Sequence, residues 1–173
     1  MPSYDFGVLN DKEFEELVVD LLSAEFQTRI ERFKPGKDEG VDGRWFSSPG
    51  RETIIQCKHW LRSGFTPLIQ HLKNKEHAKV TKLKPERYIL AISLPLSRKQ
   101  KSLISTVMAP YVLSPSDIFG AEDLNSLLSK HPTVERSYFK LWISSTEILS
   151  AFLNNAVIGR SHFALEEMRE ESC

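Results

Sequence analysis

The segment from residue 38 to residue 60, DEGVDGRWFSSPGRETIIQCKHW, has the clearest structural pattern in the sequence. The runs VDGRWF (41–46) and ETIIQCK (52–58) have the composition of β-strands, and the turn-forming run SSPGR separates them, so the segment predicts a β-hairpin. The second strand is largely apolar until its end, where Gln56 and Lys58 lie two residues apart. Residues at this spacing share one face of a strand. An amide and an ammonium on the same face indicate a polar site beside the hairpin.

The chain of 173 residues is long enough for one sizeable hydrophobic core and too short for two domains of typical size. No apolar run approaches the length of about 20 residues that spans a bilayer, and the first residues lack the pattern of a signal peptide. The two cysteines, Cys57 and Cys173, offer neither a disulfide framework nor a zinc site. We therefore expect a cytoplasmic protein without a membrane partner.

Around the hairpin the sequence predicts an α/β protein. Asn10 and Glu13 form a capping-box pair, and the apolar spacing that follows predicts a helix over 11–24. Residues 27–34 alternate as a strand does. The later predicted elements are a helix from the cap Thr66 to about residue 80, a strand over 87–94, a helix from the cap Ser97 to about residue 108, a short strand over 116–120 and a helix over 121–131. This order predicts a mixed β-sheet flanked by helices.

Residues 134–155 are rich in aromatic and aliphatic side chains and predict further helix. They extend beyond what the α/β core requires, so we assign residues 1–130 to the main domain and residues 131–173 to a helical extension or connector. Two interpretations of the extension stand side by side. It either connects the domain to another part of a longer protein or caps the core of this domain.

The charges are unevenly distributed, although the net charge is zero. Residues 61–110 hold ten Lys and Arg but only two acidic residues, whereas residues 1–60 hold eight against twelve and residues 111–173 hold five against nine. A basic middle between acidic ends favours a nucleic-acid-binding face, and it is equally typical of a solvated helix.

The polar residues of the hairpin suit a metal site. If the strands pair as predicted, Asp42 lies close to Gln56 and Lys58, and carboxylate and amide oxygens are suitable ligands for Mg²⁺. Glu15 lies on the flank of the apolar arc of the first helix, where a carboxylate usually has a partner. Each residue also has an ordinary structural interpretation: Glu15 on the flank of an amphipathic helix, Lys58 at the end of an edge strand, and Asp42 capping the turn after Gly40.

The three motifs FEELVVDLL, DEGVDGRW and IIQCKHW together resemble the Mrr-type restriction endonuclease family, which has the PD-(D/E)xK nuclease fold. The resemblance covers about residues 8–95 and rests on Phe14-Glu15, on residues 38–42 and on the Gln56-Cys57-Lys58 run. It implies Mg²⁺-dependent hydrolysis of DNA, with Mn²⁺ as a substitute. Glu15, Asp42 and Gln56 would be metal ligands, and Lys58 would complete the catalytic set.

Several further segments are similar to the N-terminal nuclease modules of large bacterial STAND-type NTPases that act in antiphage defence. The resemblance implies a homo-oligomer or a fusion to an oligomerising NTPase. The sequence contains no G-x-x-x-x-G-K-[ST] motif, so the chain itself carries no P-loop.

Three functions remain open from the sequence: a metal-dependent DNA endonuclease, a catalytically silent DNA-binding module of the same fold, and an assembly module that works through residues 134–155. If the protein is an endonuclease or a DNA-binding module, we expect residues in the basic segment 61–110, or just before it, to contact DNA phosphates. The candidate residues for these contacts are His59, Lys73, Lys75, Lys79 and Lys82.

Overall fold

A four-stranded mixed sheet forms the centre of the computed structural model, which describes residues 3–34, 40–144, 150 and 153–156. Strands β1 (Gly43–Phe46) and β2 (Glu52–Lys58) pair antiparallel as the predicted hairpin. Strand β3 (Arg87–Ile92) pairs parallel with β2, and the short β4 (Ile118–Phe119) pairs parallel with β3. The sheet order is therefore β1-β2-β3-β4.

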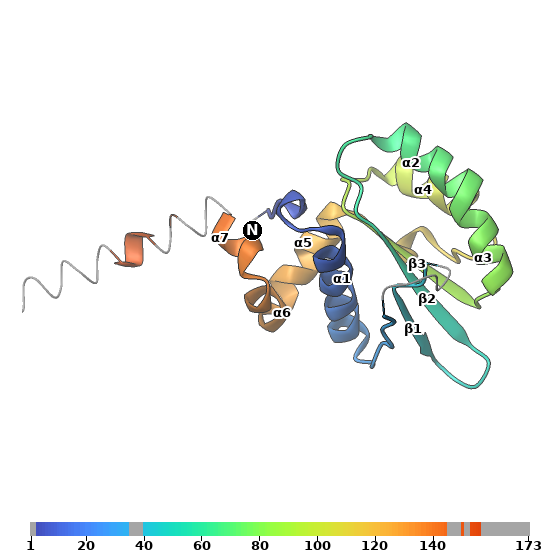
Figure 1. Ribbon diagram of the computed structural model, residues 1–173, viewed down its shortest axis with the longest axis horizontal. Helices are drawn as coiled ribbons and strands as arrows, with labels where there is room; N and C mark the ends of the chain where they lie inside the picture. Colours follow the sequence, from blue (N-terminus) through green and yellow to red (C-terminus); the bar gives the residue numbers. More distant parts are fainter. Residues whose placement is uncertain (1–2, 35–39, 145–149, 151–152, 157–173) are drawn as a thin grey trace, which may run out of the picture.

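Helices cover both faces of this sheet (Figure 1). One face carries the 3₁₀-helix η1 (Phe6–Val8), α1 (Asp11–Phe26), α5 (Ala121–Lys130), α6 (Pro132–Ser137) and α7 (Phe139–Ser144). The other carries α2 (Phe65–His71), the π-helical segment η2 (Leu72–Glu76), α3 (His77–Leu83) and α4 (Arg98–Val107). A 3₁₀-helix, η3 (Pro115–Asp117), precedes β4. The predicted fold class, a mixed sheet flanked by helices, is confirmed.

Strand β2 supplies side chains to two separate hydrophobic clusters. Ile55 and Cys57 are buried in the cluster that includes α1, whereas Ile54 is buried in the cluster that includes α2, α3 and α4. Because strand side chains alternate between faces, Gln56 and Lys58 lie on the same face as Ile54. The last two polar residues of the strand therefore face the layer formed by α2, η2 and α3.

The start of helix α1 is fixed by its predicted capping box. The Asn10 side chain accepts a hydrogen bond from the backbone N–H of Glu13, and the Glu13 carboxylate accepts one from the N–H of Asn10. The capping box of Ser97 and Gln100 at the start of α4 is likewise present. Both predicted caps are confirmed, and the first of them fixes the helix that carries Glu15.

One predicted strand is wrong, and one predicted helix differs in its cap, its end and its internal geometry. Residues 27–34 do not form a strand: Gln27 ends α1 in the left-handed conformation, and within this range Glu31 alone forms a bridge, to Arg44. Thr66 is not the cap of the helix that follows β2, since α2 begins one residue earlier and Gly64 precedes it. The predicted single helix to about residue 80 is in fact α2, η2 and α3 in succession, and α3 ends at Leu83.

The segment after α5 packs on the first face of the sheet. Leu141 is completely buried in the cluster that contains α1, and Tyr138 donates a hydrogen bond to Asp20 of α1. Of the apolar residues that favoured a helical extension, Ile148, Leu149 and Phe152 lie outside the described residues, and the boundary at residue 130 stays a prediction. Among the helices that the structure describes, we find none with the length and apolarity of a membrane span.

Candidate active site

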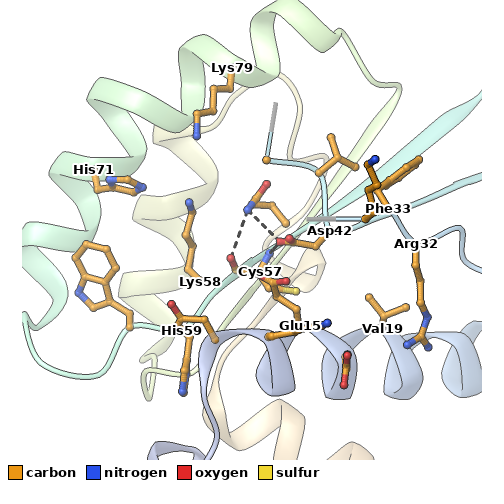
Figure 2. Close-up of a pocket in the computed structure, with 18 residues that line it drawn as sticks. Glu15, Val19, Arg32, Phe33, Asp42, Cys57, Lys58, His59, His71 and Lys79 are labelled. Atoms are coloured by element: carbon orange, nitrogen blue, oxygen red, sulfur yellow. Dashed lines mark hydrogen bonds between the residues drawn. The ribbon is translucent and has the colours of Figure 1, made fainter. Parts of the chain in front are cut away.

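A cleft of about 770 Å³ opens at the end of β2, between helix α1 and the α2–η2–α3 layer (Figure 2). All four residues of the predicted catalytic set line it. Glu15 lies on α1, Asp42 is the residue directly before β1, and Gln56 and Lys58 lie at the end of β2. The spatial proximity that the hairpin pattern predicted is therefore present.

Asp42 is held rigidly beside β2. Its carboxylate oxygen Oδ2 accepts hydrogen bonds from the backbone N–H of Cys57, at 2.7 Å, and from Nε2 of Gln56, at 3.0 Å. Its own backbone N–H donates to the carbonyl oxygen of Ile55, at 3.1 Å. The residue before β1 is thus hydrogen-bonded to β2 through its backbone as well as its side chain, and these bonds fix the direction of the carboxylate.

The environment of Asp42 favours the protonated form of its carboxyl group. Burial raises the pKa of Asp42 to about 7, and the negative charges of Glu15 and Glu76 add to the effect. The N–H of Cys57 and the charge of Lys58 oppose this rise in pKa without cancelling it. A strongly raised carboxyl pKa in a cleft is typical of functional sites, because burial and neighbouring like charges shift pKa values there.

Glu15 reaches the cleft from α1 and interacts directly with Asp42. Burial raises the pKa of Glu15, and the charges of Asp11 and Glu16 act in the same direction. A hydrogen bond with Asp42 and the charge of Lys58 lower it by less. Two neighbouring carboxyls with raised pKa values form a pair that a cation would stabilise.

The amide of Gln56 lies between two oxygen acceptors. Its Nε2 atom is 3.0 Å from Oδ2 of Asp42 and 3.4 Å from the backbone carbonyl oxygen of Cys57. The side chain is buried, with 8 % of its surface exposed. A hydrogen-bond donor therefore fills the space between a carboxylate and a carbonyl oxygen, which is a position that equally suits a cation.

Lys58 points across the cleft to a residue that the sequence analysis missed. Its Nζ atom donates a hydrogen bond of 2.5 Å to Oε1 of Glu76, in η2. Glu76 is 1 % exposed. Although burial alone raises the pKa of Glu76, the hydrogen bond and charge of Lys58, with that of Lys79, hold it below its usual range. Glu76 is therefore a buried carboxylate with a cationic partner.

A signal for Glu76 was present in the sequence. Leu68, Leu72, Glu76 and Val80 follow one another at intervals of four residues, and all four are buried. A carboxylate in a row of core positions needs a partner, because an unpaired buried charge is costly. It is also one of only two acidic residues in the basic segment 61–110.

The candidate DNA-binding residues occupy different environments. His59 lines the cleft, but its Nε2 atom binds the carbonyl oxygen of Leu9 at 2.7 Å and its ring stacks on Phe14. Lys79 lines the cleft and lies 3.5 Å from the Glu76 carboxylate. The other three candidates are exposed on the α2–η2–α3 layer and do not line the cleft: Lys73, Lys75 and Lys82.

The donor set fits a hard divalent cation. Glu15 and Asp42 supply two carboxylates, and the carbonyl oxygen of Cys57 lies on the same side as Asp42 because one amide nitrogen reaches both. Among the described residues no group of three or more His, Cys, Asp and Glu side chains is arranged to hold a metal. Mg²⁺ usually takes one or two carboxylates and completes its shell with water and phosphate oxygens, so the two carboxylates present suit it.

Comparison with known families supports a nuclease. Residues 8–83 match a family described as restriction endonuclease, Mrr_cat. The match extends from the residues before α1 to the end of α3, so all four predicted catalytic residues lie inside it. The mixed sheet flanked by helices is consistent with a restriction-endonuclease-like fold.

The chain is also similar to a longer protein. It is 41 % identical over 154 residues to the uncharacterized protein y4cD of Sinorhizobium fredii (strain NBRC 101917 / NGR234), and the alignment covers 89 % of this chain but 24 % of that protein. The chain thus spans about a quarter of the length of this relative. No solved structure matches significantly.

Proposed function

We propose that the protein is a Mg²⁺-dependent DNA endonuclease that hydrolyses phosphodiester bonds, with Mn²⁺ able to replace Mg²⁺. The observation that carries the proposal is the meeting of Glu15, Asp42 and Lys58 in one cleft, inside the segment that matches the restriction endonuclease family. Gln56 completes the set by holding the Asp42 carboxylate in place.

The protein residues divide the work by their chemistry. Glu15, Asp42 and the oxygen atoms next to them would hold the cation, which when bound supplies positive charge beside the scissile phosphate. Gln56 orients Asp42 through its amide and offers its own oxygen when the amide turns. Lys58 donates hydrogen bonds to the attacking water and to a phosphate oxygen, and its charge offsets the negative charge that develops in the transition state.

We further propose that Lys73, Lys75, Lys79 and Lys82, with His59 at the cleft, contact DNA phosphates. Support comes from the basic composition of residues 61–110 and from Lys79, which borders the cleft itself. His59 is the least suited of these groups, since its Nε2 atom already binds a backbone carbonyl and its Nδ1 atom is buried.

The protein is, in our proposal, the effector part of a bacterial antiphage defence system and is activated by oligomerisation. The sequence resemblance to nuclease modules of STAND-type NTPases supports this, as does the alignment to only a quarter of a longer relative. A single site of this kind cuts one strand, so double-strand cleavage would require two copies.

A catalytically silent module for DNA binding or assembly is the second candidate. The exposed apolar residues Phe139 and Ile143 lie four residues apart on α7 and favour an assembly role for that helix. The complete set of two carboxylates and a lysine argues against a catalytically silent module, because a protein without catalytic activity does not need these residues together.

Cleavage of supercoiled plasmid at low salt tests the nuclease proposal, because phosphate contacts weaken steeply as salt rises. The wild-type chain is compared with Asp42→Ala and Lys58→Ala, in Mg²⁺, Mn²⁺ and EDTA. The control Lys99→Ala removes an exposed lysine of α4 that does not line the cleft. We expect metal-dependent nicking by the wild type and by the control, and at least a hundredfold slower nicking by the other two variants.

Failure of the folded wild-type chain to nick DNA, both alone and artificially dimerised, would overturn the nuclease proposal in favour of the silent module. Activity that survives Asp42→Ala and Lys58→Ala would instead place the chemistry elsewhere in the chain.

A further inference from the structure

We infer that Glu76 is a positioning residue for Lys58: it fixes the ammonium at the end of β2 so that the remaining N–H donors face the space beside Asp42. The inference rests on the proposed nuclease function and extends it to a buried residue behind the cleft, which contacts the lining residue Lys58. Glu76 is outside the four residues that the motifs single out.

The geometry of the contact is that of a firmly held pair. Nζ of Lys58 lies 2.5 Å from Oε1 of Glu76, and the two side chains are 15 % and 1 % exposed. Among the described residues, Glu76 is the one acceptor of a hydrogen bond from this ammonium. The same oxygen lies 3.3 Å from Nε2 of His71 and 3.5 Å from Nζ of Lys79.

The helix conformation buries Glu76 directly behind the cleft, between the lining residues His71 and Lys79. Residues 72–76 form a π-helical turn, in which the N–H of His77 bonds to the carbonyl oxygen of Leu72, five residues earlier. Such a wide turn interrupts regular helix and occurs often at functional sites. It brings Leu72 and Glu76 to the buried side, whereas the lysines between them, Lys73 and Lys75, stay exposed.

The donor count of an ammonium explains why such a contact assists catalysis. A lysine has three N–H donors on a flexible four-carbon stem, so an unrestrained Lys58 would sample many positions. One donor bound to Glu76 removes most of that freedom, and two donors remain for water and phosphate. A buried ion pair contributes little net stability compared with apolar packing, which makes a purely stabilising role a weak explanation for Glu76.

Positioning predicts opposite effects on two steps. Replacing Glu76 by glutamine removes one negative charge from behind a cleft that would bind polyanionic DNA, so binding is expected to stay equal or to tighten. Cleavage is expected to slow, because Lys58 loses its fixed partner. A merely structural role would weaken binding and cleavage together, in proportion to the loss of folded protein.

The experiment measures both steps for the wild type, Glu76→Gln and Glu76→Asp. Single-turnover cleavage of a labelled duplex is followed at saturating protein in Mg²⁺, and duplex binding is followed by fluorescence anisotropy in EDTA. The matched control is Asp117→Asn, which removes a buried carboxylate paired with Arg87 away from the cleft. We expect Glu76→Gln to cleave at least tenfold more slowly with an unchanged or lower Kd. Glu76→Asp should recover part of the rate, and Asp117→Asn should cleave at the wild-type rate per folded molecule.

Glu76→Gln that cleaves at the wild-type rate, or that loses binding in parallel with cleavage, would overturn the inference while leaving the nuclease intact. A wild-type chain that does not cleave at all, alone or dimerised, would overturn the proposed function and the role of Glu76 with it. The two failures are therefore distinguishable from the wild-type arm alone.

Discussion

Asp42 illustrates the conflict between stability and chemistry at a single residue. Its carboxylate is fixed by a backbone N–H and an amide, yet burial and two neighbouring carboxylates raise its pKa to about 7. A group whose pKa is higher in the folded protein than the usual value of 3.8 stabilises the fold when protonated, and this contribution is lost as the pH rises from about 4 to 7. The metal-free protein therefore carries an unfavourable charge at neutral pH.

Asp42→Asn is accordingly expected to stabilise the metal-free protein at high pH. The amide oxygen can still accept from the N–H of Cys57, while the side chain can no longer ionise. Since one pKa unit corresponds to about 1.4 kcal/mol, we expect a gain on the order of 1–3 kcal/mol in the free energy of unfolding at pH 8. Urea unfolding in EDTA should show the gain at pH 8 and its disappearance near pH 4. Equal stability of variant and wild type at pH 8 would contradict this account.

Single residues also mark the limit of what the sequence predicts. The proximity of Gln56 and Lys58 was predictable because residues two apart on a strand share one face. The position of Asp42 was predictable because the hairpin brings its strand beside theirs. Glu76 was not predicted, because its place in a row of core positions indicates that it has a partner without showing which residue that partner is. Its partner Lys58 is 18 residues away and meets it only once η2 packs on β2.

At the level of secondary structure, predictions succeeded where local chemistry decides and failed where packing does. The capping boxes at Asn10 and Ser97 fix their helices without outside help. Residues 27–34 alternate like a strand, but only Glu31 finds a backbone partner, so tertiary pairing overrides the pattern. The π-helical turn of η2 was equally invisible, since it depends on how the layer packs.

The lysines of the α2–η2–α3 layer differ in their distance from the cleft. We expect Lys79→Ala to weaken DNA binding more than Lys73→Ala, Lys75→Ala or Lys82→Ala, because Lys79 alone among the four lines the cleft. Titrations over a range of salt should show that each lost phosphate contact reduces the slope of log Kd against log salt by about 0.9. Lys99→Ala should leave the slope unchanged. Unchanged slopes for all four lysine variants would move the DNA-binding face away from α2–η2–α3.

For the whole molecule, the two walls of the cleft belong to different halves of the core. Glu15 comes from α1, which packs in one hydrophobic cluster, whereas His71 and Lys79 come from the layer that packs in the other. Strand β2 contributes to both clusters. The relative position of the two walls therefore depends on this central strand.

The packing of the segment after α5 predicts where the chain can be shortened without loss of stability. A chain ending at Lys130 loses Leu141, which is completely buried, and the bond between His131 and Glu25. A chain ending at Ser144 keeps both, and beyond Leu141 no described residue is buried. We expect the shorter chain to be less stable in urea by about 3 kcal/mol or more, since burying one leucine alone contributes about 1.5–3 kcal/mol. Equal stability of the two chains would support a domain boundary at residue 130.

The turn between β1 and β2 offers a practical handle. Residues 46–51 are all exposed, and a Cβ added at Gly50 would meet nothing within 4 Å. The turn lies at the far end of the hairpin from Asp42 and Lys58 (Figure 1). Exposed loop tips tolerate insertions well. A dye or a surface tether attached there would leave the cleft open, so that individual molecules could be watched while they engage DNA.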